Sequence, residues 1–168
     1  MTHTTIVPLD GANLRDQVPL LAATDVAYLD NAATSLMPQI AIEAMSAFES
    51  ENRSNVHRGL YPIAAAATEQ YEAARQRVAQ YINARQPEEI VFTKNATEAI
   101  NLVARSCGAA LTEHDTIVVT ELEHHSNLVP WMQTSATIAW LSIEEMLDTD
   151  YAIPNSTKLV AITGQSNV

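Results

Sequence analysis

The chain has 168 residues, of which 47% are hydrophobic and 17% charged, and its net charge is −11. This balance suits one soluble globular domain, or most of one, and argues against intrinsic disorder. A chain this acidic offers no positive surface to nucleic acid or to an anionic membrane, so we expect neither as a partner. Its field also repels anions, so any bound phosphate must be held by local donors.

Three sequence features indicate a cytoplasmic protein. Residues 1–8 lack the basic region and apolar run of a signal peptide. No stretch approaches the roughly 20 apolar residues that a membrane-spanning helix needs. The single cysteine, Cys107, cannot form an intramolecular disulfide, which fits a reducing compartment.

The first half of the chain is expected to be mainly helical. Residues 1–25 form a mixed, partly helical arm, and residues 26–29 are a short strand candidate. Pro38 opens a helix, because its missing N–H would be unbonded in the first turn, and residues 52–62 form a loop. In the long helix that follows, apolar residues recur at three- and four-residue steps and predict one buried stripe: Ala67, Tyr71, Ala74, Val78 and Ile82.

The second half alternates between strand and helix patterns. Short apolar runs predict strands at residues 90–92, 116–120, 138–143 and 159–163. Helices are expected over residues 96–106 and 126–133. The first of these helices is predicted to bury one face, made of Ile100, Val103, Ala104 and Cys107. The alternation predicts an α/β fold whose mainly parallel sheet is flanked by helices, with ligands bound beyond the carboxyl ends of its strands.

A helix start after residue 92 is a candidate anion site. Asn95 suits the N-cap, and Glu98 follows at capping-box spacing. The small residues Ala96 and Thr97 leave the first amides open beside a hydroxyl, an arrangement that binds phosphate. Glu98 opposes an anion unless its carboxylate turns back to the N-cap amide. Spacing alone favours the alternative, an ordinary capped helix without a ligand, since every helix needs an N-cap.

Two adjacent histidines follow the strand candidate at residues 116–120. A neutral imidazole stacks on aromatic cofactors and moves protons near neutral pH, and only one of two neighbours on an extended chain enters a given pocket. A polar loop of hydrogen-bonded histidines is the alternative. A third hypothesis is a metal site made by Glu123, His124 and His125 with a distant His57, but the i,i+4 histidine pair of a helical zinc site is missing. We therefore expect no metal.

Two further polar segments are candidates. Residues 30–34 are dense in turn-formers. Residues 55–59 place an imidazole, a cation and a glycine in one loop, where Arg58 suits a bidentate carboxylate contact. Taken singly, residues 55–59 are better explained as a solvated loop with a surface arginine.

Taken together, five segments form one ordered pattern, at residues 28–34, 55–59, 92–101, 123–131 and 166–168. This pattern resembles the SufS-type (group II) cysteine desulfurases, which belong to the aminotransferase class V group of pyridoxal-phosphate enzymes. The resemblance implies that residues 26–168 are the N-terminal part of the large domain of a fold-type I pyridoxal-phosphate-dependent transferase, and that residues 1–25 are an arm.

The resemblance also implies roles for single residues. Ala96 and Thr97 would bind the phosphate of pyridoxal 5′-phosphate, His124 would stack on its ring and shuttle protons, and Asn167 would lie near its phenolic oxygen. Substrate contacts, in the pocket or at its entrance near the dimer partner, are implied for Asp30, Asn31, Ala32, His57 and Arg58.

The implied reaction converts L-cysteine to L-alanine and leaves the sulfur as a persulfide on an enzyme cysteine. The implied setting is iron–sulfur cluster assembly by a homodimer, with a sulfur-acceptor protein of the SufE or SufU type.

The chain departs from the pattern at several points. The family's cofactor lysine and persulfide cysteine would lie beyond residue 168, and neither Lys94 nor Lys158 matches that lysine. We therefore expect a fragment that is inactive alone. A short segment between Trp131 and Lys158, and unusual residues at 164–165, leave open a selenocysteine lyase, another class V enzyme or a non-catalytic phosphate-binding fragment.

Overall fold

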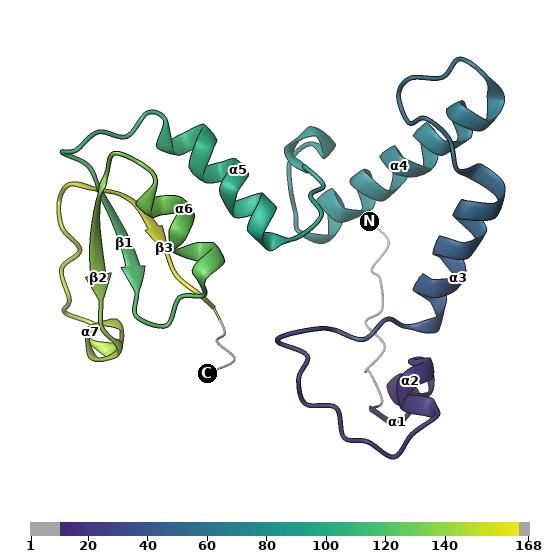
Figure 1. Ribbon diagram of the computed structural model, residues 1–168, viewed down its shortest axis with the longest axis horizontal. Helices are drawn as coiled ribbons and strands as arrows, with labels where there is room; N and C mark the ends of the chain where they lie inside the picture. The colour runs from purple at the N-terminus through teal and green to yellow at the C-terminus, as the bar shows by residue number, and fades with distance from the viewer. Residues whose placement is uncertain (1–10, 165–168) are drawn as a thin grey trace. The chain divides into compact units, whose positions relative to one another are not determined.

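Residues 11–164 are described by a computed structural model, in which the chain divides between Val91 and Phe92 into two units (Figure 1). Asn167, a predicted cofactor residue, lies outside the described residues. Among residues 11–164, no helix is both long and apolar enough to cross a membrane.

The first unit is helical, as predicted. Its elements are α1 (Gly11–Asp16), α2 (Pro19–Ala22), α3 (Gln39–Ala47), the π-helix η1 (Phe48–Asn52), α4 (Pro62–Tyr81) and the 3₁₀-helix η2 (Pro87–Glu89). Pro38 is the N-cap of α3 rather than its first residue. The predicted loop lies between η1 and α4, and Pro62 opens α4 at a position where a missing N–H costs nothing.

The strands predicted at residues 26–29 and 90–92 are wrong, because neither segment has a strand assigned in the described chain. In both segments an arginine side chain, rather than a neighbouring strand, donates to a backbone carbonyl. Arg15 Nη1 donates to the Val26 carbonyl at 3.1 Å, and Arg75 Nη1 donates to the Ile90 carbonyl at 2.7 Å. An apolar run becomes a strand only where another strand pairs with it.

The buried stripe predicted on α4 is only partly right. Ala67 is fully buried, with Ala64 beside it, because the preceding loop packs closely on the start of the helix. Gly59 permits this approach, since a Cβ there would stand 2.2 Å from Ala64 Cβ. Of the other predicted members, Tyr71 and Val78 are half-buried. Ala74 and Ile82 are exposed.

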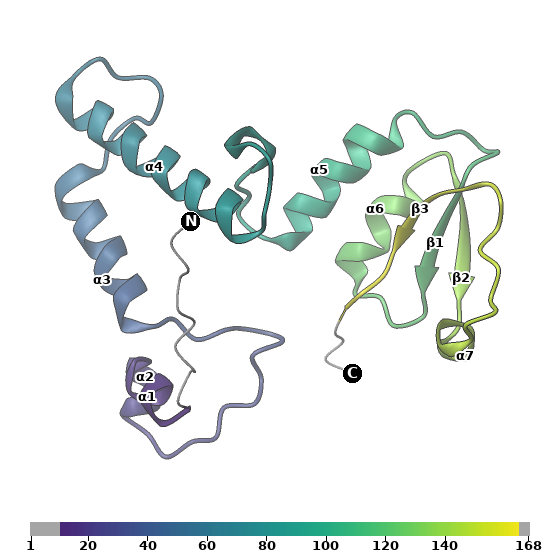
Figure 2. The same cartoon turned by 180° about the vertical axis from the view of Figure 1, so that it is seen from behind.

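The second unit carries a parallel sheet, as predicted. Its elements are α5 (Ala96–Gly108), β1 (Thr116–Thr120), the 3₁₀-helix η3 (His125–Asn127), α6 (Val129–Met132), β2 (Thr137–Leu141), α7 (Ile143–Leu147) and β3 (Thr157–Ala161). The strand order is β2-β1-β3, with β1 central (Figures 1 and 2). The helix predicted over residues 126–133 is divided into η3 and α6. The strand predicted to reach residue 143 ends earlier, because Ser142 and Glu145 form a capping box that starts α7.

The core of the second unit lies between the sheet and the helices α5 and α6. Side chains alternate along β1, so Ile117 and Val119 face the helices while Val118 lies on the opposite face. The buried cluster is made of Ala104, Ile117, Val119, Trp131 and Ala161. This packing positions the start of α5 and the loop after β1 on one side of the unit.

The buried face predicted for α5 is right at Ala104 but wrong at Val103 and Cys107, whose side chains are exposed. The helix instead turns Ala104 and Gly108 inward. Gly108 is required by close packing, because a Cβ there would lie 2.6 Å from Thr134 Cγ2. Cys107 is therefore a surface thiol and not a packing residue.

At the amino end of β1, Asp115 organises the start of the sheet. Its Oδ2 accepts hydrogen bonds from the Thr112 amide and from the Thr112 hydroxyl, each at 2.8 Å. Its carbonyl accepts from the Thr137 amide at 2.9 Å, which joins the start of β2. The bonds from Thr112, with Lys158 and His114 adding smaller attractions, hold the pKa of Asp115 below its ordinary value.

We expect Asp115 to stabilise the fold in a pH-dependent way. A carboxyl whose pKa is lowered by folding contributes stability above its unfolded pKa, about 3.9, and loses it as the pH falls through the folded-state pKa. The difference in free energy of unfolding between the wild type and Asp115→Asn should be constant above about pH 5 and shrink below it. Urea denaturation at several pH values measures this difference, and the exposed Glu113→Gln is the control. A difference that grows on acidification contradicts the assignment.

Candidate functional site

The carboxylate of Glu123 joins the ends of two strands. Parallel strands bring their carboxyl ends to one edge of the sheet. Glu123 Oε1 accepts a hydrogen bond from the Thr120 hydroxyl, at the end of β1, and another from the Thr163 amide, just after β3, each at 2.7 Å. Two of the segments predicted to lie near a ligand therefore meet at one side chain.

The same carboxylate fixes the loop that leaves β1. Glu123 Oε2 accepts from Asn127 Nδ2 at 2.6 Å, and Asn127 Oδ1 accepts from Trp131 Nε1 at 3.2 Å. Trp131 is only 4% exposed and belongs to the core cluster. The loop bearing His124 and His125 is thus held at both ends by buried or half-buried groups.

His124 is held by the turn that follows it. It is the N-cap of η3, and its Nδ1 accepts a hydrogen bond from the Ser126 amide at 3.1 Å. The Ser126 hydroxyl oxygen lies 2.8 Å from the same nitrogen. The ring is exposed, and the neighbouring His125 ring stands edge-on to it at 6.1 Å between centroids. An ordered imidazole therefore faces outward from the sheet edge.

The start of α5 is capped in a way that leaves its first amides open. Asn95 Oδ1 accepts from the Glu98 amide at 2.9 Å, as the N-cap prediction requires. The Glu98 carboxylate turns back, but to the amide of Lys94 at 2.8 Å rather than to that of Asn95. Within residues 11–164, no hydrogen bond is recorded for the amides of Ala96 and Thr97. Such a pair at a helix N-terminus suits an anion.

One hollow brings the two predicted elements together. Thr97, in the first turn of α5, and His124, in the loop after β1, line the same space of about 280 Å³. Its other lining residues are Asn101, His125, Ser126, Val129 and Pro130. A helix N-terminus able to hold a phosphate and an imidazole able to stack on a ring therefore border one space.

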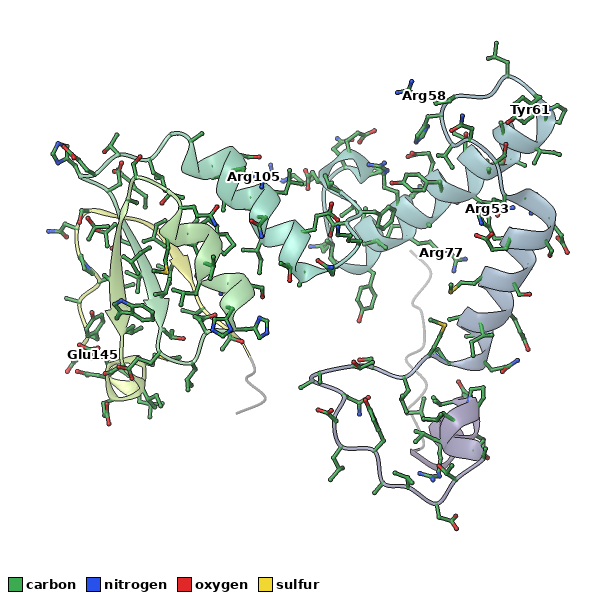
Figure 3. All side chains as sticks on the ribbon, in the orientation of Figure 1. Arg53, Arg58, Tyr61, Arg77, Arg105 and Glu145 are labelled. Carbon is green, nitrogen blue, oxygen red and sulfur yellow. The ribbon has the colours of Figure 1, made fainter. Side chains whose placement is uncertain are left out.

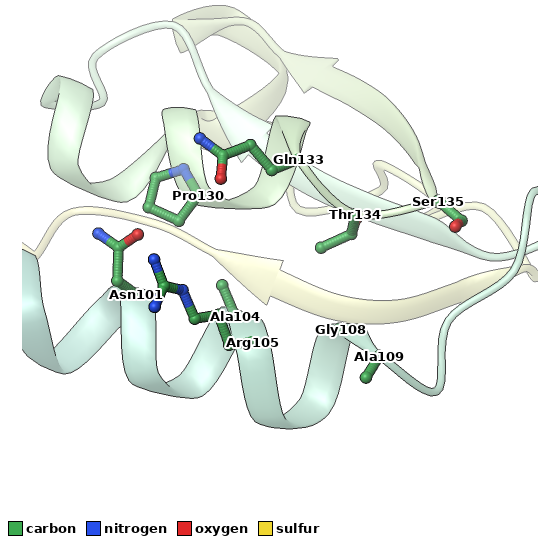
Figure 4. A pocket seen from close by; sticks show the side chains of 9 residues that line it. All are labelled: Asn101, Ala104, Arg105, Gly108, Ala109, Pro130, Gln133, Thr134 and Ser135. Atoms are coloured by element: carbon green, nitrogen blue, oxygen red, sulfur yellow. The ribbon is translucent and has the colours of Figure 1, made fainter.

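Two other hollows border α5. One, of about 460 Å³, contains Thr97 but not His124, and Lys94 and Arg105 are among its lining residues. The other lies between α5 and α6, where the side chains of Asn101 and Arg105 rise toward Pro130 (Figure 4). Arg105 stands in the last turn of α5, where a cation complements the carbonyl end of the helix. Its position is therefore explained without a ligand.

The predicted substrate residues belong to the first unit. Asn31 and Ala32 lie in an exposed turn, closed by a 3.1 Å bond from the Thr34 amide to the Asp30 carbonyl. The turn predicted from composition is confirmed. The approach of these residues to the hollow in the second unit stays a prediction.

His57 and Arg58 stand in the loop before α4. His57 has a positive φ of 63°, and its amide donates to the Thr68 hydroxyl at 3.0 Å. Its Nε2 lies 3.0 Å from Glu72 Oε1. Arg58 projects outward from the loop (Figure 3).

The structure also bears on the metal hypothesis. The Glu123 carboxylate is occupied by three donors, and His57 belongs to the other unit. Among residues 11–164, no group of three or more histidine, cysteine, aspartate or glutamate side chains is arranged to hold a metal ion.

Sequence reasoning missed three residues that shape the site: Asn101, Glu123 and Ser126. Glu123 was considered only as a metal ligand. Its structural role is only weakly indicated by the sequence. Glu123, Asn127 and Trp131 follow one another at intervals of four residues, a spacing that lets side chains on a helical segment meet. Its bond to Thr163 joins residues forty positions apart and has no local signal.

Comparison with known proteins indicates the family of the chain. A family model described as aminotransferase class-V matches residues 27–168. A probable cysteine desulfurase of Synechocystis sp. is 41% identical over 96% of this chain and 42% of that protein. Another of Halalkalibacterium halodurans is 45% identical over 84% of this chain and 37% of that protein. The apo structure of a cysteine desulfurase from Thermococcus onnurineus NA1 matches with a TM-score of 0.77 at 36% identity, over 94% of this chain and 40% of that one. The chain thus spans less than half the length of these relatives.

Removing the Glu123 carboxylate should destabilise the second unit. Glu123→Ala removes the hydrogen bonds that the Thr120 hydroxyl, the Thr163 amide and the Asn127 side-chain amide donate to the carboxylate, so we expect a loss of about 1.5–3 kcal/mol in the free energy of unfolding. Glu123→Gln should also destabilise, because its amide NH₂ would face a donor. Urea denaturation measures both effects. The control is Glu121→Ala, at an exposed glutamate two residues away, which should change the free energy of unfolding by less than about 0.5 kcal/mol. Equal effects at the two positions would show that the network contributes nothing.

Proposed function

This chain belongs to the aminotransferase class-V family, and we propose on that premise that it forms the cofactor-phosphate part of a pyridoxal-phosphate-dependent cysteine desulfurase. One observation carries the proposal: Thr97 at the start of α5 and His124 after β1 line the same hollow. The proposed reaction of the whole enzyme takes L-cysteine to L-alanine and an enzyme-bound persulfide.

The residues at this hollow fit a phosphorylated aromatic cofactor. The amides of Ala96 and Thr97 and the Thr97 hydroxyl provide donors for phosphate oxygens, and the helix N-terminus favours their negative charge. These local donors offset the repulsion that a chain of net charge −11 exerts on an anionic phosphate. When bound, pyridoxal 5′-phosphate supplies an electron sink for the substrate.

The capping groups of α5 leave its first two backbone amides available to an anion. The bond from the Glu98 amide to Asn95 sets the direction of the first turn, and the bond from the Lys94 amide holds the Glu98 carboxylate. With that carboxylate engaged at Lys94, the amides of Ala96 and Thr97 remain available to an anion. His124 offers the exposed face of an imidazole to the same hollow, for stacking and for moving a proton.

Other parts of the proposal rest on the resemblance of sequence. They are the SufS subtype, the supply of sulfur to iron–sulfur clusters, a cytoplasmic homodimer and an acceptor protein of the SufE or SufU type. Residues 26–168 would belong to one large domain. The proposed roles of Asn167 near the cofactor, and of Asn31, Ala32, His57 and Arg58 near the substrate, have the same support.

We propose also that residues 1–168 are inactive alone, because neither lysine suits the cofactor. Lys158 lies 4.0 Å from Asp115, which stands before β1 at the amino edge of the sheet, opposite the candidate site. Lys94 lines the hollow that excludes His124. Neither ammonium group is therefore placed to bond a cofactor stacked on that ring.

Thr97→Val should weaken binding of pyridoxal 5′-phosphate about 10–100-fold, because one hydrogen bond to a charged group is lost while the shape of the side chain is kept. Calorimetric titration of the 168-residue chain measures the affinity. Ser106→Ala, on the same helix but bonded to its own turn, is the matched control and should bind as the wild type does. Equal affinities for all three proteins would contradict the phosphate assignment.

Borohydride treatment of the chain mixed with pyridoxal 5′-phosphate should trap no adduct at a specific lysine. Both lysines lie away from His124, so any labelling should be weak and divided between them. Peptide mass mapping after reduction shows where the label lies. Stoichiometric labelling of Lys94 or Lys158 alone would overturn the claim that the chain is inactive by itself.

A further inference from the structure

We propose that Ser126 is a positioning residue that fixes the tautomer of His124, so that the neutral ring carries its proton on Nε2. The meaning of this inference for catalysis rests on the proposed function, but the tautomer itself is a property of the chain alone.

The geometry at Nδ1 leaves one assignment. The Ser126 backbone amide is 3.1 Å from His124 Nδ1 and can only donate, so Nδ1 must present a lone pair. The Ser126 hydroxyl, 2.8 Å from the same nitrogen, must then donate as well, because Nδ1 has no proton to give. A neutral imidazole has one N–H, and here it is on Nε2.

Asn127, on the far side of the turn from His124, also fixes the position of the His124 backbone. The His124 carbonyl accepts from the Asn127 amide at 2.8 Å, while Asn127 Nδ2 is bound to Glu123. The backbone on both sides of the His124 ring is therefore fixed by the network that joins β1 to β3. No hydrogen bond to His124 Nε2 is recorded within residues 11–164, and the residue lines the hollow shared with Thr97.

The tautomer decides what His124 offers a bound ring. It presents a neutral imidazole for stacking and an N–H at Nε2 for an acceptor in the hollow. Its only lone pair in the ring plane, at Nδ1, is already used by Ser126. While both bonds to Ser126 are in place, the polar group that His124 offers to a ligand in the hollow is the N–H donor at Nε2.

The test is a two-bond ¹H–¹⁵N correlation spectrum of the histidine rings in the 168-residue chain, at a pH where they are neutral. In the wild type, His124 should show the Nε2–H form alone, whereas the 88% exposed side chain of His114 should show a mixture and serves as the internal reference. Ser126→Thr keeps both donors and should behave as the wild type does. In Ser126→Asp the carboxylate only accepts, so the ratio of Nε2–H to Nδ1–H should fall about tenfold or more.

A wild-type His124 with the Nδ1–H form, or with the same mixture as His114, overturns the proposal. So does an unchanged ratio in a folded Ser126→Asp variant. If that variant does not fold, the wild-type spectrum and the Ser126→Thr spectrum decide alone. The spectra need no cofactor, so a chain that keeps the predicted tautomer but binds no pyridoxal 5′-phosphate would sink the proposed function and leave this inference standing.

Discussion

The carboxylate of Glu123 is where the separate parts of the second unit meet. It accepts from Thr120 at the end of β1, from Thr163 two residues after β3 and from Asn127 in the helical turn that follows His124. A half-buried carboxylate is tolerated here because donors satisfy both of its oxygens. These bonds tie the loop that carries His124 to the ends of both strands. Its role is structural, because all three of these bonds are to groups of the protein itself.

Much of the fold followed from local patterns. The helix start at Asn95 and the parallel strand at residues 116–120 are encoded by residues close in the chain, and both are found as predicted. The failures lie where tertiary pairing decides. The apolar runs at 26–29 and 90–92 have strand-like composition but no strand assigned among the described residues, and arginine side chains take two of their carbonyls. Helical periodicity also failed to tell which of two adjacent faces of α5 would be buried, so Cys107 was wrongly assigned to the core.

The candidate site was predictable in its parts but not in its assembly. Spacing placed donors at Ala96 and Thr97 and histidines after β1, and the rule for parallel sheets directed attention to that edge. The bond between Glu123 and Thr163 spans forty residues, and no sequence pattern predicts it. The tautomer of His124 likewise depends on the fold of one turn, which brings both the backbone amide and the hydroxyl of Ser126 to Nδ1. The candidate residues could thus be proposed from sequence, while the groups that hold them could not.

The central claim is that Thr97 and His124 serve one ligand. Titration of the ¹⁵N-labelled chain with pyridoxal 5′-phosphate, and separately with pyridoxal, tests it directly by mapping which amide and ring signals move. The account predicts that the phosphate compound shifts the amides of Ala96 and Thr97 and the His124 ring with one common Kd, and that pyridoxal leaves the two amides unmoved. Shifts at these positions with different Kd values, or no shift at either, would contradict it.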